Sequence, residues 1–332
     1  MNKFLIIQTA SIGDVILINP LIETLHLNFK DAVIDVLVKK GNESLFSGHP
    51  FVREVISWDK SKRKYNNLFS EIQRIRRENY DTVINCQRFA SSGLITVLSG
   101  AKKKTGFSKN PFSFLFSEKY PHHIGTKPYM HEVDRNLQLV SSFYKVTIRN
   151  PKLYPTEADQ NLIAGFTKSP FITVAPASLW FTKQFPAEKW IEFIRQIPEN
   201  YNVIMLGGKN EIELCDTIIA ASSHKNSLNL AGKLSMLQSA ALMGKALMNY
   251  VDDSAPLHFA SAMNAPVRAV FCSTVQDFGF GPLSDNSAVI ETTNELKCRP
   301  CGLHGHNTCP ESHFRCAYDI TTEQLLKTLP PL

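Results

Sequence analysis

The fold is decided by residues 3–15, Lys3-Phe4-Leu5-Ile6-Ile7-Gln8-Thr9-Ala10-Ser11-Ile12-Gly13-Asp14-Val15. The apolar run before Gln8 predicts a short buried strand, and the apolar periodicity of Val15–Leu27 predicts a helix after a tight turn. A strand followed at once by a turn and a helix is typical of an open α/β sheet, whose ligands bind at the carboxyl ends of the strands. Asp14 is therefore either an acid of the first helical turn, favoured by the helix dipole, or an ionised carboxylate facing a cleft.

The alternation of strands and helices continues through both halves, and it predicts two doubly wound α/β domains. A linker with two prolines, residues 150–155, separates a domain of residues 1–150 from one of residues 151–332. We expect strands at Lys3–Gln8, Val33–Val38, Glu54–Trp58, Thr82–Cys86, Lys104–Phe107, Phe171–Ala175, Asn202–Leu206, Ser227–Leu230, Ala246–Val251, Val267–Phe271 and Ala288–Ile290. We expect helices at Val15–Phe29, Asn67–Asn79, Ser92–Leu98, His131–Tyr144, Glu157–Phe166, Ala187–Gln196, Glu211–Ala221, Ser235–Met243 and Ala255–Met263. Residues 108–129 interrupt this rhythm and predict an aromatic, basic loop.

The composition is that of an ordinary globular protein, with 332 residues of which 43% are hydrophobic and 20% charged, so disordered and coiled-coil classes are excluded. No apolar run approaches the length of a membrane span, and the N-terminus lacks the order of regions of a signal peptide. We therefore expect a cytoplasmic protein. Its seven cysteines are then thiols or metal ligands rather than a disulfide framework.

The net charge of +6 is modest, but basic runs gather in the first third of the chain, at residues 60–64, 74–77 and 102–104. Such runs are either solvated faces or a wall for an anionic partner. That partner is a phosphorylated substrate, acidic lipid head groups or nucleic acid.

Polar residues follow the expected strands of the second half repeatedly. The hydroxyls of Ser178 and Thr182, together with Lys183, can hold a phosphate after the first of these strands. After the second, Gly207 begins a tight turn, and Glu211 can grip a ribose or merely cap that turn.

A helix start follows the strand expected at Ala246–Val251. Asp253 or Ser254 can cap this helix, Pro256 suits its first turn, and its free N–H groups suit a diphosphate. His258 lies about one turn further, where it faces either the core or the ligand.

Three fingerprints are absent from the sequence. No Gly-x-Gly-x-x-Gly follows the first strand, which counts against a dehydrogenase. A Walker A sequence and a Gly-x-Ser-x-Gly elbow are also missing, which counts against P-loop enzymes and α/β-hydrolases.

Five short motifs occur in the order in which one known family has them. They are Ser11-Ile12-Gly13-Asp14-Val15, Thr182-Lys183-Gln184-Phe185-Pro186, Leu206-Gly207-Gly208, Leu230-Ala231-Gly232 and Asp253-Ser254-Ala255-Pro256-Leu257-His258. In this ordered set the chain resembles the ADP-heptose:lipopolysaccharide heptosyltransferases, glycosyltransferase family nine, from Lys3 to about Pro282. Ala255 is a departure, because the family usually has glycine there and the methyl group can restrict how closely the backbone approaches a diphosphate.

The resemblance implies the GT-B architecture: two Rossmann-like domains facing across a cleft, the acceptor on the first and the nucleotide sugar on the second. It implies an inverting transfer that requires no metal, with Asp14 as general base and with Ser11 and Gly13 beside the acceptor. Together with the loops above, it assigns to the nucleotide sugar Ser178, Thr182, Lys183, Gly207, Glu211, Asp253, Ser254, Ala255 and His258. The implied partners are ADP-heptose, or a related nucleotide sugar, and an anionic lipopolysaccharide-core acceptor, with no nucleic acid.

The basic runs then gain a specific role in gripping that acceptor. The residues expected to do so are Lys62, Arg63, Lys64, Lys102, Lys103 and Lys104. The aromatic stretch Phe112–Tyr120 would lie near the acceptor's lipid end, which predicts peripheral contact with the inner face of the inner membrane.

A cysteine cluster near the C-terminus is not needed for this transfer. Cys298-Arg299-Pro300-Cys301 is followed by Cys309 and Cys316, with His304, His306 and His313 interleaved. This pattern suggests a closed, structural zinc site of four cysteines, or one with a histidine replacing a cysteine; the alternative is a loop of free thiols.

Two other functions remain open at this point. A nucleotide-sugar epimerase or hydrolase of the same fold would not need the basic first domain. A zinc-containing nucleic-acid-binding protein would use the basic runs, but these lie far in sequence from the cysteines and no recognised module accompanies them.

Overall fold

The computed structural model describes residues 2–60, 64–142, 145 and 147–332, without the side chains of residues 64–66. It contains two compact units, which we call unit 1 (Met1–Tyr154) and unit 2 (Pro155–Leu332).

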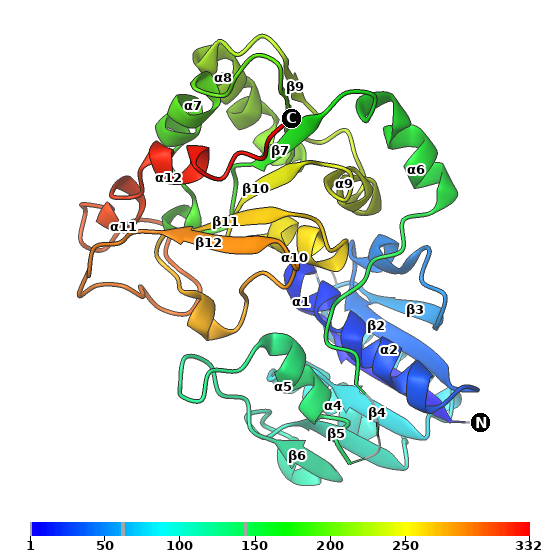
Figure 1. Ribbon diagram of the computed structural model, residues 1–332. Helices are drawn as coiled ribbons and strands as arrows, with labels where there is room; N and C mark the ends of the chain where they lie inside the picture. Colours follow the sequence, from blue (N-terminus) through cyan, green and yellow to red (C-terminus); the bar gives the residue numbers. More distant parts are fainter. Residues whose placement is uncertain (1, 61–63, 143–144, 146) are drawn as a thin grey trace. The chain divides into compact units, whose positions relative to one another are not determined.

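Unit 1 is built on a six-stranded parallel sheet with the strand order β3-β2-β1-β4-β5-β6 (Figure 1). Its central strands are continuous hydrophobic runs because helices cover both faces of the sheet. The strands are β1 (Lys3–Gln8), β2 (Val33–Lys39), β3 (Val52–Trp58), β4 (Thr82–Asn85), β5 (Lys103–Phe107) and β6 (Glu118–Tyr120).

The helices of unit 1 form two layers, because α2 contacts α5 and α3 contacts α4. They are α1 (Ile12–Ile16), α2 (Asn19–Asn28), α3 (Lys64–Arg77), α4 (Ala90–Leu98) and α5 (Glu132–Gln138). A buried cluster that includes Leu5, Ile56 and Trp58 of the sheet and Ile72 and Ile75 of α3 fills the space under the α3–α4 layer.

Unit 2 repeats this topology with the strand order β12-β11-β10-β7-β8-β9. Its strands are β7 (Phe171–Ala175), β8 (Asn202–Met205), β9 (Ser227–Asn229), β10 (Met248–Asp252), β11 (Val267–Phe271) and β12 (Ser287–Glu291). Its helices are α6 (Glu157–Ile163), α7 (Ala187–Arg195), α8 (Ile212–Ser222), α9 (Met236–Met243), α10 (Ala255–Ala262), α11 (Arg315–Tyr318) and α12 (Thr322–Leu326). The core of this unit packs Trp190 and Phe193 of α7 and Ile218 of α8 onto the sheet.

Each sheet has one place where the strand order reverses direction. In unit 1 it lies between β1 and β4, and in unit 2 it lies between β7 and β10. The connections that leave two such strands run to opposite faces of the sheet, so a crevice opens at their carboxyl ends, and ligands of doubly wound folds bind there. The fold class expected from the sequence, two Rossmann-like doubly wound domains, is confirmed.

The helix expected at Val15–Phe29 is wrong in its bounds. Helix α1 already begins at Ile12, and α2 begins separately at Asn19. The break follows from Pro20, which has no N–H to continue the ladder, while the Asn19 side chain donates to the Ile16 carbonyl at 3.1 Å.

Three further expectations need correction. The loop expected at residues 108–129 contains the edge strand β6, which pairs with β5 through its backbone. Helix α5 ends at Gln138 rather than near Tyr144 and spans Glu132–Gln138. Tyr144 itself lies outside the described residues. The short helices α11 and α12 were not expected, since each is under two turns long and carries little periodicity.

Candidate functional site

Asp14 lies at the point of unit 1 where the strand order reverses. Ser11 is the residue before α1, and its hydroxyl donates to the Asp14 carboxylate across the first helical turn. The pKa of Asp14 is raised above its ordinary value, chiefly because the surrounding protein desolvates this half-buried carboxylate and also because the charge of Glu132 lies close. Hydrogen bonds from Ser11 offset part of this increase. Asp14 is thus a carboxylate with increased affinity for a proton.

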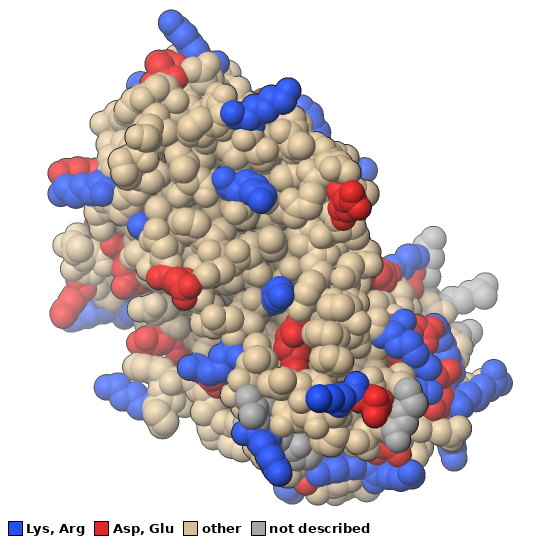
Figure 2. All heavy atoms as spheres, turned by 45° about the vertical axis from the view of Figure 1, so that its right-hand side comes forward, with Lys and Arg blue, Asp and Glu red and all other residues tan. Residues whose placement is uncertain are grey.

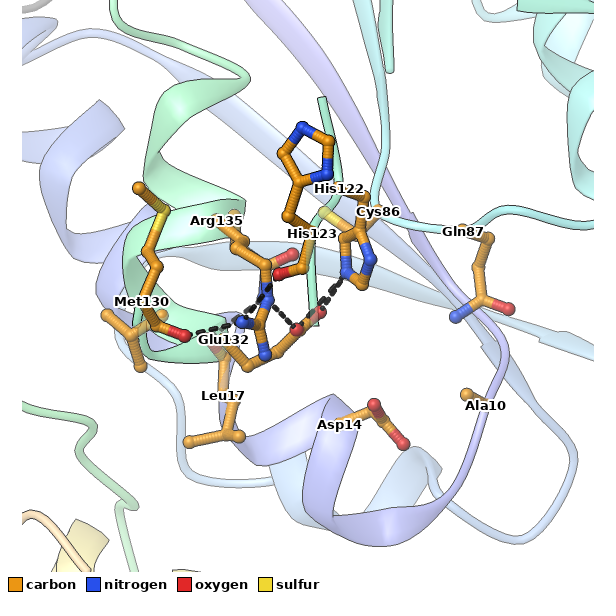
Figure 3. Close-up of polar contacts among 12 residues, drawn as sticks. Ala10, Asp14, Leu17, Cys86, Gln87, His122, His123, Met130, Glu132 and Arg135 are labelled. Atoms are coloured by element: carbon orange, nitrogen blue, oxygen red, sulfur yellow. Dashed lines mark hydrogen bonds and ion pairs between the residues drawn. The ribbon is translucent and has the colours of Figure 1, made fainter. Parts of the chain in front are cut away.

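A buried network on α5 supplies the charge that acts on Asp14. The Glu132 carboxylate lies 3.1 and 3.2 Å from His122 Nε2 and accepts a hydrogen bond from Arg135 Nε at 2.6 Å. All three side chains are at most 4% exposed. Burial alone would raise the pKa of Glu132, but His122 and Arg135 lower it below its ordinary value, so the carboxylate stays ionised. Figure 3 shows this network above Asp14, with Ala10 and Gln87 on the other side of the Asp14 carboxylate.

Polar side chains of three elements hold the turn that precedes Asp14. Gln8 Oε1 accepts a hydrogen bond from the Ala10 N–H at 3.3 Å and another from the Gln87 side chain after β4. Lys60, after β3, donates to the Thr9 carbonyl and hydroxyl at 2.9 Å each. Sequence reasoning missed Glu132, Gln87 and this role of Lys60, because their partners lie about 50 to 120 residues away in the chain.

In unit 2, Lys183 and Asp253 form an ion pair at the carboxyl ends of β7 and β10, where the strand order of this sheet reverses. Lys183 Nζ lies 2.7 Å from Asp253 Oδ2, which also accepts a hydrogen bond from the Thr274 hydroxyl at 2.6 Å. The Ser178 hydroxyl contacts the Asp253 carbonyl at 3.4 Å. The loop after β7 and the turn after β10, both expected to hold a phosphate, are therefore brought together.

The next two residues of that turn begin α10. Ser254 is the residue before the helix, and Ala255 and Pro256 form its first turn, as the sequence predicts. The Ser254 hydroxyl oxygen is enclosed and has no hydrogen-bond partner among the residues that the structure describes. His258 is 5% exposed, and its ring lies edge-on to Phe280. An enclosed hydroxyl beside a helix N-terminus suits a phosphate oxygen.

Of the two roles expected for Glu211, gripping a ribose or capping a turn, the structure shows the cap. Its carboxylate accepts a hydrogen bond from the Gly208 N–H at 2.6 Å and so caps the turn after β8. A Cβ on Gly207 would lie 2.8 Å from the Glu211 Cβ, so glycine is needed for this close packing. Within the described part of unit 2, no hydrogen bond or ion pair joins Glu211 to Lys183 or Asp253.

The lysines at residues 102–104 are not brought to Asp14. Lys103 is the first residue of β5 and pairs in register with Thr82, the first residue of β4. Because all strands run parallel, these residues lie at the edge of the sheet opposite Asp14. Lys102 and Lys103 are also paired with Asp81 and Glu118 at 2.8 and 2.6 Å. Lys62, Arg63 and the side chain of Lys64 lie outside the described residues.

Two cationic side chains that sequence reasoning missed lie at the carboxyl edge of the unit 1 sheet, the edge at which Asp14 lies. Arg88 follows the end of β4 by three residues, and Lys109 follows the end of β5 by two. Neither forms an ion pair with any residue that the structure describes. Their position directly after a strand is the signal that would have revealed them. On the face that Figure 2 shows, Lys and Arg side chains lie among Asp and Glu side chains.

Comparison with known proteins shows to which family the chain belongs. The family model of glycosyltransferase family 9 (heptosyltransferase) matches residues 68–310. The chain belongs to glycosyltransferase family 9. It is 24% identical to lipopolysaccharide heptosyltransferase 2 of Escherichia coli K12, over 99% of this chain and 98% of that protein.

Solved structures agree with this family 9 assignment at the level of the fold. E. coli ADP-heptose lps heptosyltransferase II has a TM-score of 0.80 and 22% identity, over 98% of this chain and 96% of that one. E. coli heptosyltransferase WaaC with ADP-2-deoxy-2-fluoro heptose has a TM-score of 0.71 and 19% identity, over 98% of this chain and 99% of that one. The protein is therefore a glycosyltransferase with the GT-B fold.

The aromatic stretch of this family 9 glycosyltransferase divides into buried and exposed parts. Phe116 is 9% exposed and packs on Gly106, whereas Phe114 is 71% exposed. Phe89, which follows Arg88, is 60% exposed, and its carbonyl accepts a hydrogen bond from Asn110 at 2.9 Å. In the described part of the chain, no helix combines the length and apolar character required to cross a membrane.

The acidic side chains of Asp35, Glu54 and Glu78 are gathered in unit 1, with ligand atoms within 4.8 Å of one another. Arg53 donates to Asp35 and to Glu78, and Lys3 and Arg74 pair with Glu78 and Glu54. These four acid–base contacts neutralise the cluster, so it is an ion-pair network that stabilises one face of the sheet rather than a cation site.

Proposed function

We propose that this protein transfers heptose, or a related sugar, from an ADP-sugar to an anionic lipopolysaccharide-core acceptor, with inversion at the anomeric carbon. Unit 1 binds the acceptor and unit 2 binds the nucleotide sugar. The similarity to lipopolysaccharide heptosyltransferases supports the substrate class. The observation that carries the mechanism is the position of Asp14, a carboxylate with a raised pKa at the carboxyl edge of the unit 1 sheet.

In the proposed step Asp14 is the general base. The acceptor hydroxyl oxygen attacks the anomeric carbon, its proton moves to the Asp14 carboxylate, and the bond from the anomeric carbon to the ADP oxygen breaks on the opposite face. A raised pKa increases the affinity of the carboxylate for that proton, provided that Asp14 is ionised when the acceptor binds. Ser11, which donates to Asp14, and the adjoining Gly13 position the base beside the acceptor.

The departing ADP gathers negative charge on its diphosphate. Lys183 lies next to Asp253, the residue before Ser254, so its ammonium group is held close to the N-terminus of α10. A lysine and the N–H groups of a helix terminus together stabilise a leaving diphosphate without a metal ion. Thr182 and the enclosed Ser254 hydroxyl complete the donor cradle, by which we mean Ser178, Thr182, Lys183, Asp253 and Ser254.

The acceptor would be gripped by cations at the Asp14 edge of unit 1. Arg88 and Lys109 are suited to its phosphates and carboxylates, since no carboxylate among the described residues neutralises them. Lys62, Arg63 and Lys64 are proposed to grip the same acceptor. Phe89 and Phe114 are exposed apolar side chains in the segments that carry Arg88 and Lys109, and they would contact the lipid end of the acceptor or the membrane surface.

The test is to follow ADP release from ADP-heptose with deep-truncated lipopolysaccharide, for the protein and for Asp14→Asn. We expect release to require the acceptor and kcat to fall at least about 100-fold in the variant, because a general base contributes this much or more. The ADP affinity of Asp14→Asn should be unchanged.

Two outcomes would contradict the proposal. Release that needs no acceptor would favour a nucleotide-sugar hydrolase or epimerase of the same fold. Full acceptor-dependent activity of Asp14→Asn would exclude Asp14 as the base.

A further inference from the structure

The four cysteines of the C-terminal segment, Cys298, Cys301, Cys309 and Cys316, line one small cavity of unit 2. The cavity encloses about 10 Å³ of free volume, which is the room of a single water-sized occupant. Within it, Cys298 Sγ lies 3.9 Å from His313 Nε2. A cavity of this size lined by four thiols suits one metal ion and no larger ligand.

His313 is oriented as a donor to sulfur rather than as a metal ligand. Its Nδ1 accepts a hydrogen bond at 3.0 Å from the Arg315 backbone N–H, a group that can only donate. The proton of the neutral ring therefore sits on Nε2, which points toward Cys298. The Phe314 N–H donates to Cys309 Sγ in the same way, at 3.4 Å. N–H groups aimed at sulfur stabilise thiolates, so the ligand set is the four cysteines.

The segment that carries these cysteines is bonded to the donor cradle through its backbone. The Thr182 N–H donates to the His306 carbonyl at 3.0 Å, and the His306 N–H donates to the Thr182 hydroxyl at 2.8 Å. The Cys301 N–H donates to the Ser273 carbonyl at 2.8 Å. Ser273 in turn precedes Thr274, which bonds to Asp253. These hydrogen bonds connect the cysteine segment directly to Thr182 and, through Ser273 and Thr274, to Asp253.

Two side chains add to this connection. Arg299, inside the Cys-x-x-Cys turn, donates to the Cys272 and Thr274 carbonyls at 2.7 and 2.8 Å. The Phe314 ring packs on Phe181 of the loop after β7, with ring centroids 5.1 Å apart. The four thiols are not as tightly gathered as bound ligands: among the described residues, the acidic cluster of Asp35, Glu54 and Glu78 is the only group of three or more potential metal ligands whose ligand atoms all lie within 4.8 Å of one another. Binding must draw the sulfur atoms together.

We propose that Cys298, Cys301, Cys309 and Cys316 bind a single thiolate-preferring divalent metal ion, Zn²⁺, and that this closed site fixes the Thr182–Lys183 part of the donor cradle. The four thiols lose their protons to solvent as the metal–sulfur bonds form. Four sulfur ligands leave no open position, so the metal orders the loop and takes no part in the transfer. Only the consequence for ADP binding rests on the proposed function.

The test measures three quantities on the purified full-length protein, on Cys309→Ser and on Cys215→Ala. Cys215 is a buried thiol of α8 that does not line the cavity, so it is the matched control. Zinc and iron contents are determined by mass spectrometry. Backbone hydrogen exchange over residues 176–186 is compared before and after a chelator, and ADP affinity is measured by calorimetry.

We expect one zinc ion per chain in the protein and in Cys215→Ala, and none in Cys309→Ser. Removing the ion should speed exchange at Thr182 and weaken ADP binding about tenfold, and re-adding Zn²⁺ should restore both. Removing the ion from the unsubstituted protein and adding Zn²⁺ again keeps the test valid if Cys309→Ser fails to fold.

The outcomes separate the two proposals. A chain that holds no metal as purified and takes up none from Zn²⁺ or Fe²⁺ would overturn the metal site. Iron in place of zinc would overturn the assigned ion. Metal-independent exchange at residues 176–186 would overturn the link to the donor cradle. Metal-dependent exchange without ADP binding would support the metal site and contradict the proposed function.

Discussion

Asp14 shows how one residue acquires its chemistry from neighbours far away in the chain. Its position in the first turn of α1 would by itself lower the pKa of an acid, because the helix dipole favours negative charge there. Burial and the charge of Glu132 act in the opposite direction, and they outweigh the hydrogen bonds from Ser11. The Glu132 side chain stays ionised in the interior only because His122 and Arg135 both contact it.

Glu132→Gln tests this electrostatic role. Removing the Glu132 charge removes one of the contributions that raise the pKa of Asp14, so that pKa should fall. Since a general base must be ionised, the acidic limb of the kcat/KM profile against pH should move to lower pH. The plateau rate should decrease, because the base is weaker.

Stability must be measured alongside the profile. The substitution leaves Arg135 buried without its carboxylate, which should cost about 3 kcal/mol of stability. A purely structural role would lower the melting temperature without moving the acidic limb, and a shift to higher pH would contradict the assignment.

At the scale of elements, the donor cradle depends on loops that contact one another rather than on any single helix. The loop after β7 is anchored at its end by the Phe185 N–H, which donates to the buried Asp252 at 3.1 Å. Burial raises the pKa of Asp252 well above its ordinary value. On its other side the same loop contacts the cysteine segment, in which Gly302 and Gly305 adopt left-handed backbone angles, φ +73° and +77°.

Gly305→Ala and Gly302→Ala form a matched pair that tests the contact between the segments. Both variants place a side chain on left-handed backbone, so each should lose about 1–2 kcal/mol of stability. A Cβ on Gly305 would lie 2.9 Å from Thr182 Oγ1, whereas a Cβ on Gly302 meets nothing closer than His306 Nε2 at 3.6 Å. Only Gly305→Ala should therefore weaken ADP binding, as measured by calorimetry. Equal affinities in the two variants would show that the contact does not shape the cradle.

At the scale of the whole molecule, parallel strands decide which charged residues can act together. Every strand of unit 1 begins at one edge of the sheet and ends at the other, so residues that follow strands share the edge of Asp14. Lys102 and Lys103 stand at a strand start and are paired with acids. Arg88 and Lys109 follow strand ends.

Arg88→Gln and Lys102→Gln test this topological argument. Loss of Arg88 should raise the KM for the lipopolysaccharide acceptor about tenfold, the effect expected when a charged hydrogen bond is removed. Lys102→Gln removes the same charge from the opposite edge and should leave the acceptor KM unchanged. Steady-state kinetics at fixed ADP-heptose compares the two, and equal effects would point to a general loss of positive charge instead.

Much of the fold could be predicted from local pattern. Short apolar runs mark the central strands because these strands are buried on both faces, and the helices between them carry their own periodicity. Strand β6 and helices α11 and α12 were missed, because their few residues are held by neighbours rather than by a pattern of their own. The break at Pro20 could have been predicted, since proline cannot continue a helix.

The sequence by itself determined the two strand–helix repeats, the carboxylate after the first strand, the polar loop that carries Thr182 and Lys183 and the spacing of the four cysteines. Only the tertiary structure decided that Glu132 lies beside Asp14, that Lys183 meets Asp253, that residues 102–104 stand at the wrong edge and that the cysteine segment bonds to Thr182. Hydrophobic periodicity is written locally along the chain because each element buries one side. The partner of a charge is set by strand order and packing, which join residues separated by up to about 120 positions.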